Sequence, residues 1–367
     1  MQILNQTRYE HEFTMGMDNS GREYLSLVVK GTFDFPTNPE DTPCVSAEQR
    51  PLVMADEASG APGYSSTLWE TDFAFRKMRC DVVLQGAAYA PSGQAAERVR
   101  VGIRVGNWLK QFDVVGQREW RVIGPAITAT RPYPFTRQPF SYDTAFGGPD
   151  RSVHDDPAPP VYRANPVGTG YATLRSNAQI SGIPLPNTES PDDPVTSPFG
   201  RYRPMAFGPL SRAAPERLQY GGTYDEGWKA NVFPFLPADF DERYYQMAPE
   251  DQQIDFPITG TPVILGNLTP RGREEFCLPD TALPIKVERG REVCFEGRVL
   301  PDTLIFDPDA AVFMLVWRIW VPMRRIITEF TEAWIGPPTP AMIRTRDEGR
   351  GYLRAVATTN SEIEEEP

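Results

Sequence analysis

Apolar and polar residues alternate with a period of two in several segments of the chain. Between Arg98 and Val105, three valines and Ile103 share one face of an extended chain, and three arginines share the other. The segments Glu23–Phe35 and Cys80–Tyr89 alternate in the same way, which is typical of half-buried strands. We therefore expect residues 1–125 to form an N-terminal, mostly antiparallel β-sheet region.

Further short apolar runs bounded by turn residues predict additional strands. These runs are Leu109–Val115, Glu119–Ile123, Pro262–Asn267, Leu283–Val287, Glu292–Leu300, Thr303–Phe306 and Ala311–Val321. The last two flank Asp307-Pro308-Asp309, a turn-forming sequence that predicts a hairpin. The segment Met323–Ile335 fits both a helix face and a strand alternation. A second β-sheet region is expected over residues 256–336.

The middle of the chain, residues 126–255, interleaves prolines with aromatic residues and glycines. Disordered segments are poor in aromatic residues, so we expect long ordered loops packed over the sheets. Two short helical turns are predicted, at Asp225–Asn231 and Asp239–Met247, with Asp225 and Asp239 as their N-caps. After Gly336 the chain is first proline-rich and then acidic, which predicts a flexible tail over residues 337–367.

Together these patterns predict a mainly β fold. We expect an antiparallel β-sandwich, as one large sandwich or two packed ones, with long Pro/Gly-rich ordered loops and a few short helices. Proline supports this prediction, because 38 of the 367 residues are proline, where about 5% is usual. Proline is excluded from helix interiors, so helical bundles and helical solenoids do not fit the chain.

Charge limits the classes of partner. The formal net charge is −12, and an anionic chain of this kind repels nucleic-acid backbones and anionic lipid surfaces. The most apolar segment, Ala310–Met323, is too short to cross a bilayer and contains Arg318. We expect neither nucleic-acid binding nor membrane insertion. The N-terminal residues lack a basic stretch followed by an apolar run, so we expect a cytoplasmic protein.

The residues that usually carry chemistry are sparse. The cysteines Cys44, Cys80, Cys277 and Cys294 are spaced for neither zinc nor a redox loop, and the two histidines, His11 and His154, cannot build a multi-histidine site. We therefore expect no metal and no cofactor. His154 is followed by Asp155 and Asp156, which we interpret as a solvated acidic turn. Nucleophile-elbow and phosphate-loop motifs do not occur in the sequence.

One enzymatic alternative stays open. Carboxylates lie near aromatic residues at Asp56-Glu57, at Glu70 beside Trp69, and at Asp225-Glu226 near Trp228. A pair of such carboxylates across a sugar cleft would make a glycosidase on a β-sandwich. Acidic residues near aromatic ones are common, so we weigh catalysis below a binding role.

A series of short sequence motifs is more specific to one family than the composition is. In chain order they are Pro51–Glu57, Gly60–Gly63, Ser65-Ser66, Asp72-Phe73, Lys77, Asp81–Pro91, Phe135–Pro139, Ala145–Gly148, Asn165–Gly168, Gly222–Trp228, Phe235–Asp241, Ala248–Gln253 and Asn267–Gly272. With them the chain resembles a bacterial family known as domain of unknown function 2169. Its members are encoded beside type VI secretion spike genes and act as effector adaptors or chaperones. The likeness extends over about residues 1 to 320.

The resemblance implies a non-enzymatic function. A member of this family would hold a toxin effector in the cytoplasm and deliver it to the spike or tip protein of the secretion apparatus. The resemblance supplies no catalytic residues. A structural component of the secretion or phage-tail-like apparatus is the first alternative, and a carbohydrate-active enzyme is the second.

Clustered aromatic residues are the candidates for partner binding, because exposed apolar patches mark interaction sites. One candidate patch lies between residues 224 and 240, and the other lies on a Gly/Pro/Ser-rich loop. The candidate residues are Tyr224, Trp228, Phe233, Phe235 and Phe240 in the first patch and Tyr64, Leu68 and Trp69 in the second. Acidic charge would also speed the capture of a basic effector segment.

Overall fold

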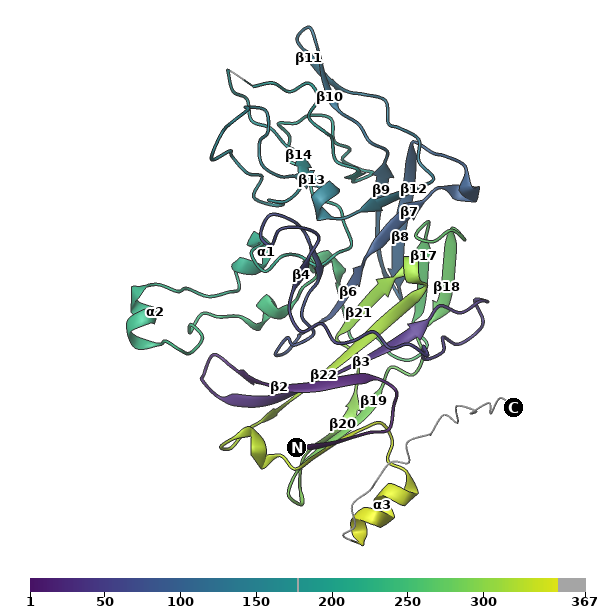
Figure 1. Cartoon of the computed structure of the whole chain (residues 1–367), viewed down its shortest axis with the longest axis vertical. Helices are drawn as coiled ribbons and strands as arrows, with labels where there is room; N and C mark the ends of the chain where they lie inside the picture. Colours follow the sequence, from purple (N-terminus) through teal and green to yellow (C-terminus); the bar gives the residue numbers. More distant parts are fainter. Residues whose placement is uncertain (177, 349–367) are drawn as a thin grey trace, which may run out of the picture.

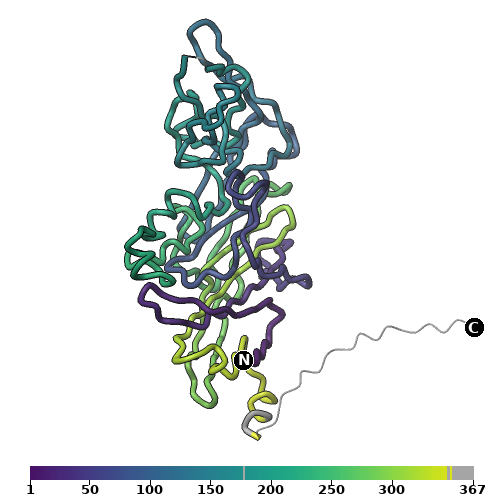
Figure 2. Tube along the Cα trace, turned by 60° about the vertical axis from the view of Figure 1, so that its left-hand side comes forward, coloured from purple at the N-terminus to yellow at the C-terminus, as the bar shows by residue number. Residues whose placement is uncertain are grey.

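The computed structural model describes residues 1–176 and 178–348 of the chain. These residues form several mostly antiparallel sheets and only short helices, so the predicted mainly β fold is confirmed. Figures 1 and 2 show an elongated molecule, and Figure 1 shows the strands distributed along its long axis.

The largest sheet has six strands. In spatial order they are β16 (Gln253–Ile254), β6 (Cys80–Leu84), β21 (Thr303–Asp307), β22 (Val312–Pro322), β3 (Glu23–Asp34) and β2 (Glu10–Met17). Strands β6 and β21 pair in parallel, and the other neighbours pair antiparallel. One sheet therefore combines strands from both of the predicted β regions, residues 1–125 and 256–336.

Two further sheets complete the main body. The five-stranded sheet is antiparallel and contains β15 (Thr188–Glu189), β9 (Trp108–Val115), β8 (Arg98–Val105), β17 (Pro262–Gly266) and β18 (Arg273–Cys277). The four-stranded sheet contains β1 (Gln2–Asn5), β23 (Glu332–Ile335), β19 (Leu283–Arg289) and β20 (Glu292–Val299). In the latter, β1 runs parallel to β23.

The remaining elements are short. Two-stranded sheets pair β4 (Glu57–Ala58) with β5 (Thr67–Trp69), β7 (Gly86–Tyr89) with β12 (Arg137–Phe140), β10 (Trp120–Ile123) with β11 (Ala126–Ala129), and β13 (Phe146–Gly147) with β14 (Thr169–Gly170). The helices are α1 (Pro215–Leu218), α2 (Glu226–Asn231) and α3 (Pro340–Asp347). Single 3-10 turns are η1 (Pro91–Gly93), η2 (Tyr142–Thr144), η3 (Glu242–Tyr245), η4 (Glu250–Gln252), η5 (Pro308–Ala310) and η6 (Ile327–Glu329).

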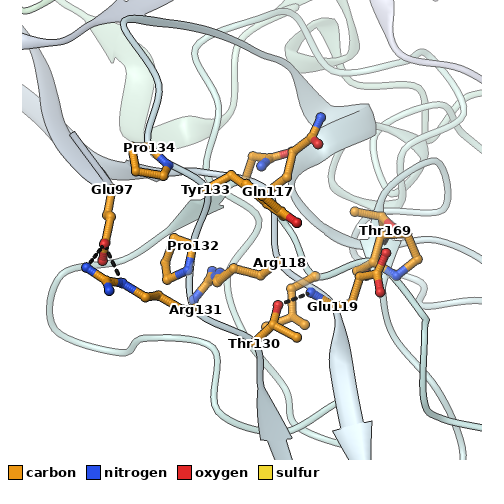
Figure 3. A pocket seen from close by; sticks show the side chains of 13 residues that line it. Glu97, Gln117, Arg118, Glu119, Thr130, Arg131, Pro132, Tyr133, Pro134 and Thr169 are labelled. Carbon is orange, nitrogen blue, oxygen red and sulfur yellow. Dashed lines mark hydrogen bonds and ion pairs between the residues drawn. The ribbon is translucent and has the colours of Figure 1, made fainter. Parts of the chain in front are cut away.

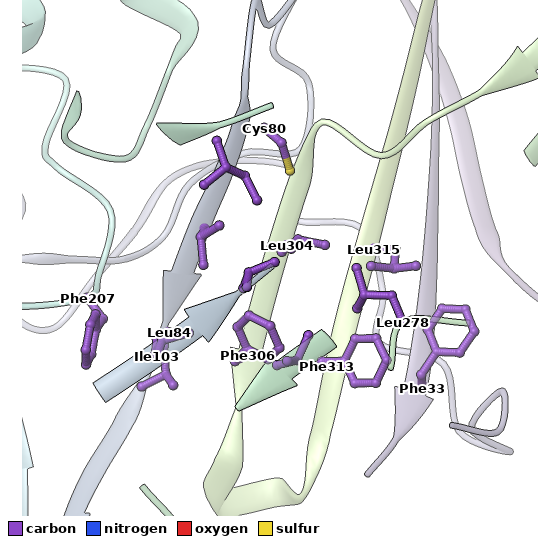
Figure 4. Packing of buried hydrophobic residues seen from close by; sticks show 14 of the residues in the cluster. Phe33, Cys80, Leu84, Ile103, Phe207, Leu278, Leu304, Phe306, Phe313 and Leu315 are labelled. Atoms are coloured by element: carbon purple, nitrogen blue, oxygen red, sulfur yellow. The ribbon is translucent and has the colours of Figure 1, made fainter. Parts of the chain in front are cut away.

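One apolar cluster joins the three large sheets. It takes Phe33 and Phe313 from the six-stranded sheet, Ile103 and Phe276 from the five-stranded sheet, and Ile285 from the four-stranded sheet. Figure 4 shows part of this packing, in which Phe33, Phe306 and Phe313 lie beside leucines of neighbouring strands. Each fully buried side chain of this size stabilises the fold by roughly 1.5–3 kcal/mol. The three large sheets thus share one apolar core.

Strand β3 differs from its prediction. The alternating pattern of Glu23–Phe35 predicts one buried and one solvent-facing side, but both sides of the strand are buried. The prediction of a half-buried strand is wrong because long loops cover the outer face of the six-stranded sheet. Lys30 on that face donates a 2.9 Å hydrogen bond to the buried carboxylate of Asp72 in one of these loops.

Three smaller expectations are settled by the described residues. Asp225 caps α2 as predicted, but Asp241, not Asp239, caps η3, because the Asp239 side chain accepts hydrogen bonds from Thr223 instead. The ambiguous segment Met323–Ile335 contains η6 and the strand β23. The first part of the predicted flexible tail, residues 337–367, forms α3, whose Met342 is buried, and residues 349–367 lie outside the described residues.

Candidate functional site

Residues 219–241 project from the side of the molecule, and we call them the aromatic lobe. The segment leaves the body after α1, contains α2 and returns before η3. Figure 1 shows α2 at the far end of this projection. The first predicted aromatic patch lies entirely within it.

Local interactions explain the turn at the tip of the lobe. The side chain of Asp225 accepts a 2.7 Å hydrogen bond from the backbone N–H of Trp228, which satisfies one free donor at the start of α2. The helix ends at Asn231, and Pro234 follows shortly after. Asp225 and Pro234, which lie close to α2 in the sequence, therefore mark the start and the end of this short helix.

Three aromatic side chains of the lobe pack edge to face. The ring centroids of Tyr224 and Trp228 are 4.7 Å apart at an interplanar angle of 73°, and those of Trp228 and Phe233 are 5.6 Å apart at 90°. Such arrangements are favourable for aromatic pairs. Tyr224 is nevertheless 55% exposed and Phe233 is 66% exposed, while Trp228 is half-buried between them. The result is an ordered aromatic surface that faces solvent.

The other two predicted residues of this patch connect the lobe to the body. Phe240 is buried, and its ring lies 5.5 Å from that of Tyr245, which in turn lies 6.1 Å from the ring of Phe75. Phe235 is half exposed, but its ring packs over Gly21 in the turn between β2 and β3, where an added Cβ would lie 3.2 Å from the ring. Phe240 therefore anchors the lobe and does not add to its exposed surface.

A buried arginine holds both ends of the lobe. Arg217 in α1 is 2% exposed, and its guanidinium donates to the carboxylate of Glu70 and to the carbonyl oxygens of Leu210 and Tyr244. Tyr244 lies just after the lobe and Arg217 just before it, so the two ends are joined through one side chain. No motif marks Arg217 in the sequence, because its partner Glu70 is 147 residues away.

The aromatic surface is bordered by carboxylates. The lobe contains Asp225, Glu226, Asp239 and Asp241 against the single cation Lys229. Hydrogen bonds from Thr223 lower the pKa of the Asp239 carboxyl, and the hydrogen bond from Arg243 lowers that of Asp241. Both carboxyls are therefore ionised at neutral pH. Since Asp241 is paired with Arg243, the acidic character of the lobe comes from Asp225, Glu226 and Asp239.

The second predicted patch is divided by the structure. Tyr64 is 87% exposed on the loop before β5, whereas Leu68 and Trp69 are half-buried within that strand. Trp69 packs against a small apolar cluster on the outer face of the six-stranded sheet. Of the three residues, Tyr64 presents its ring to solvent.

Three of the carboxylates considered for glycosidase chemistry, Asp56, Glu70 and Asp225, are engaged in ion pairs or a helix cap. Arg212 bridges two of them, because its Nε donates to Asp56 at 2.6 Å and its Nη2 lies 3.1 Å from Glu70. Asp225 caps α2, and the side chain of Glu226 is 92% exposed. In the acidic turn, Asp156 forms an ion pair with Arg175 at 2.7 Å.

Two further features of the site concern metal ligands and membrane-spanning helices. Residues 1–176 and 178–348 contain no group of three or more His, Cys, Asp or Glu side chains arranged to hold a metal ion. Among the helices of the same residues, none has both the length and the apolar character needed to span a membrane.

The fold and the lobe define a mainly β protein whose long ordered loops carry an exposed, acidic-bordered aromatic surface. The chain belongs to the bacterial family described as uncharacterized protein conserved in bacteria (DUF2169), which matches residues 20–318. The match begins after β2 and ends within β22, so it includes the lobe and the whole five-stranded sheet but not β1, β2 or β23. No curated protein and no solved structure shows significant similarity to the chain.

Proposed function

We propose that this protein is a non-enzymatic adaptor or chaperone that binds a toxin effector of a type VI secretion system in the cytoplasm and promotes its loading onto the spike. The resemblance described above suggests the secretion pathway. The observation that carries the binding role is the exposed edge-to-face cluster of Tyr224, Trp228 and Phe233 on an anchored lobe.

Physical chemistry supports protein binding at this surface. Aromatic side chains provide large contact areas with few rotatable bonds, so they lose little entropy when a partner covers them. Arg217 and Phe240 fix the base of the lobe, so its surface is organised before a partner arrives. An effector surface that is apolar and basic would complement both the rings and the carboxylates.

The experiment uses surface variants in a host that lacks its own copy of the gene. Tyr224→Ala and Phe233→Ala remove exposed rings, so each should leave the melting temperature nearly unchanged. We expect the double variant to bind the purified toxin at least tenfold more weakly, which corresponds to about 1.4 kcal/mol. We also expect one toxin to lose stability or secretion while tube and sheath assembly continue.

A matched control replaces exposed aliphatic residues elsewhere. Leu174 is 86% exposed and Ile258 is 64% exposed, so Leu174→Ala with Ile258→Ala removes comparable apolar surface outside the lobe. This control should bind the toxin like the native chain. Failure of the whole apparatus in the deletion host would favour a structural component, and turnover of a carbohydrate by the purified protein would favour the enzymatic alternative.

A further inference from the structure

A cavity of about 790 Å³ lies at the foot of the β10–β11 hairpin, near the upper end of the molecule in Figure 1. Two of its walls are residues 117–119, which precede β10, and residues 130–134, which follow β11. A third wall contains Pro184, Leu185 and Asn187. The volume falls within the range of ~300–1,000 Å³ that is typical of small-ligand sites. None of the lining residues belongs to the aromatic lobe, so the cavity is a separate site.

Tyr133 presents an aromatic ring at the wall of the cavity. It is 73% exposed, and no other aromatic residue of the described chain lines the cavity. The N–H of Tyr133 donates to the carbonyl oxygen of Gln117 at 3.1 Å. The carbonyl oxygen of Tyr133 packs against Gly116, where an added Cβ would lie 1.8 Å away. Pro132 and Pro134 restrict the backbone on either side. The ring is therefore held in a fixed position and faces solvent.

The polar side chains of the cavity keep hydrogen-bonding groups free. The side chains of Gln117 and Glu119 form no hydrogen bond or ion pair within residues 1–176 and 178–348. The amide of Asn187 donates to the carbonyl oxygen of Val115 at 3.0 Å, which leaves its Oδ1 as an acceptor. Arg118 is 8% exposed, and its Nε–H has no partner in the described part of the chain. The cavity therefore offers both donors and acceptors to a ligand.

The charged side chains of the cavity offset one another. Two arginines and two glutamates line it. Figure 3 shows Arg131 bonded to Glu97, where the Nε of Arg131 donates to the carboxylate at 2.6 Å. Arg118 is paired with the buried Glu189 at 3.0 Å. A lining without net charge attracts neither an anionic nor a cationic ligand, so it favours a neutral polar one.

A neutral carbohydrate has the chemistry that this cavity complements. A pyranose has an apolar C–H face, which packs on the electron-rich face of an aromatic ring such as that of Tyr133. Its hydroxyl groups each donate and accept hydrogen bonds, as the free groups of Gln117, Glu119 and Asn187 require. A proline-rich peptide is also neutral, but it binds grooves lined by several aromatic side chains. Tyr133 is a single ring, which favours the sugar.

We propose that this cavity binds a neutral oligosaccharide, with the Tyr133 ring against one sugar and the free polar side chains hydrogen-bonded to its hydroxyl groups. The cavity binds the sugar without cleaving it. Glycoside hydrolysis uses two carboxyl groups, whereas Glu97 is held by Arg131 and leaves Glu119 as the free carboxylate of the described lining. The proposal goes beyond the proposed function, since the site shares no residue with the lobe.

The test titrates the full chain with trisaccharides by isothermal titration calorimetry. The neutral probes are cellotriose, maltotriose and tri-N-acetylchitotriose, and trigalacturonic acid is the charged comparator of equal length. We expect at least one neutral probe to bind with a dissociation constant below ~1 mM, and the charged one to bind about tenfold more weakly. No binding of any neutral probe at millimolar concentration, or tighter binding of trigalacturonic acid, would overturn the proposal.

Variants of Tyr133 locate the binding in the cavity. Tyr133→Ala removes the ring, and its melting temperature should stay close to that of the native chain because Tyr133 is 73% exposed. We expect this variant to bind the trisaccharide about tenfold more weakly. Tyr133→Phe keeps the ring and should bind within about twofold of the native chain. Equal binding by Tyr133→Ala and the native chain would overturn the proposal.

A double variant tests the hydrogen bonds to the sugar. Gln117→Ala with Glu119→Ala removes two exposed side chains that form no bond within the described residues, so the fold should be preserved. We expect the trisaccharide to bind this variant about tenfold more weakly, because its hydroxyl groups lose partners in the cavity. Native affinity in the double variant would overturn the proposal.

Two further outcomes would assign the cavity to another function. Release of shorter sugars from the trisaccharide would overturn the proposal in favour of the enzymatic alternative. A ten-residue polyproline peptide that binds more tightly than every neutral trisaccharide, and fails to bind Tyr133→Ala, would overturn it in favour of a protein partner. The lobe variants Tyr224→Ala and Phe233→Ala should bind the trisaccharide like the native chain. Their result keeps a failure at this cavity distinct from a failure of toxin binding at the lobe.

Discussion

The indole Nε1–H of Trp228 donates a 2.9 Å hydrogen bond to the carbonyl oxygen of Phe235, seven residues later in the chain. This bond closes the tip of the lobe on itself. With the edge-to-face contacts of Trp228 to Tyr224 and Phe233, it makes the half-buried indole the centre of an otherwise exposed surface.

Replacing Trp228 by phenylalanine tests the contribution of that bond. Trp228→Phe keeps a ring between Tyr224 and Phe233 but leaves the Phe235 carbonyl without its donor, at a net cost of about 1 kcal/mol. Since the bond lies within the lobe, hydrogen exchange over residues 226–236 should accelerate several-fold while the melting temperature changes little. Lys229→Ala is the control, because the side chain of Lys229 is largely exposed and should not affect this exchange.

Removing Arg217 should have a much larger effect. Arg217→Met leaves the carbonyl oxygens of Leu210 and Tyr244 without a donor and deprives the buried Glu70 of one of its two arginines. Breaking a buried ion pair from one side costs about 3–5 kcal/mol. We expect a loss of this order in the free energy of unfolding in urea, or failure to fold.

A double variant checks the origin of that loss. Arg217→Met combined with Glu70→Leu removes both charges, so it should be more stable than Arg217→Met alone. A double variant that is less stable than Arg217→Met would show that the unpaired Glu70 carboxylate does not cause the loss of stability. Arg212 would then be sufficient to neutralise Glu70.

The buried Lys110 makes the free energy of unfolding depend on pH in the alkaline range. Burial lowers its pKa from 10.5 to about 8, although its Nζ donates to Gln252 at 2.6 Å and to Asp251 at 3.2 Å. Between these two pKa values the unfolded lysine binds a proton that the folded one has lost. The free energy of unfolding therefore gains a contribution that rises with pH across this window.

The expected result is a stability difference that depends on pH. From pH 8 to pH 9.5, the native chain should gain about 1–2 kcal/mol relative to Lys110→Met, as measured by urea unfolding. Lys229→Met, at a largely exposed lysine outside this buried network, is the control variant. If the stability of the native chain relative to Lys110→Met stays constant or falls as the pH rises, the lowered pKa of Lys110 is contradicted.

Gly148 and Gly182 form a matched pair for backbone crowding. Both have left-handed φ values, +84° and +87°, so alanine costs roughly 1–2 kcal/mol at either position. A Cβ at Gly148 would lie 1.9 Å from the carbonyl oxygen of Gly168. A Cβ at Gly182 would have no neighbouring heavy atom of the described residues within 4 Å. We expect Gly148→Ala to lower the melting temperature far more than Gly182→Ala. Equal decreases in melting temperature would mean that the loop around Gly168 moves aside at little energetic cost.

The strands with a clear period of two could be predicted from the sequence. The predicted Arg98–Val105 coincides with β8, and its arginines are exposed while its valines are buried. The same reasoning failed for the burial of β3, because a local pattern cannot show that a distant loop will cover a polar face. Lys30 looks like a solvent-facing residue until Asp72 is placed beside it.

The aromatic lobe was only partly visible in the sequence. The density of rings between Tyr224 and Phe240 marked the segment, but exposure of each ring depends on contacts with residues far away. Phe240 is buried because Tyr245 and Phe75 lie around the base of the lobe.

The parallel pairing of β6 with β21, and the eleven-residue pairing of β3 with β22, have a consequence for biosynthesis. A nascent chain carries β3 and β6 long before their respective partner strands, β22 and β21, leave the ribosome. Contacts between segments so distant in sequence form slowly, and apolar strands without neighbours are prone to aggregate. The six-stranded sheet can close only after Pro322 has emerged, so β3 and β6 remain without these partner strands for most of synthesis.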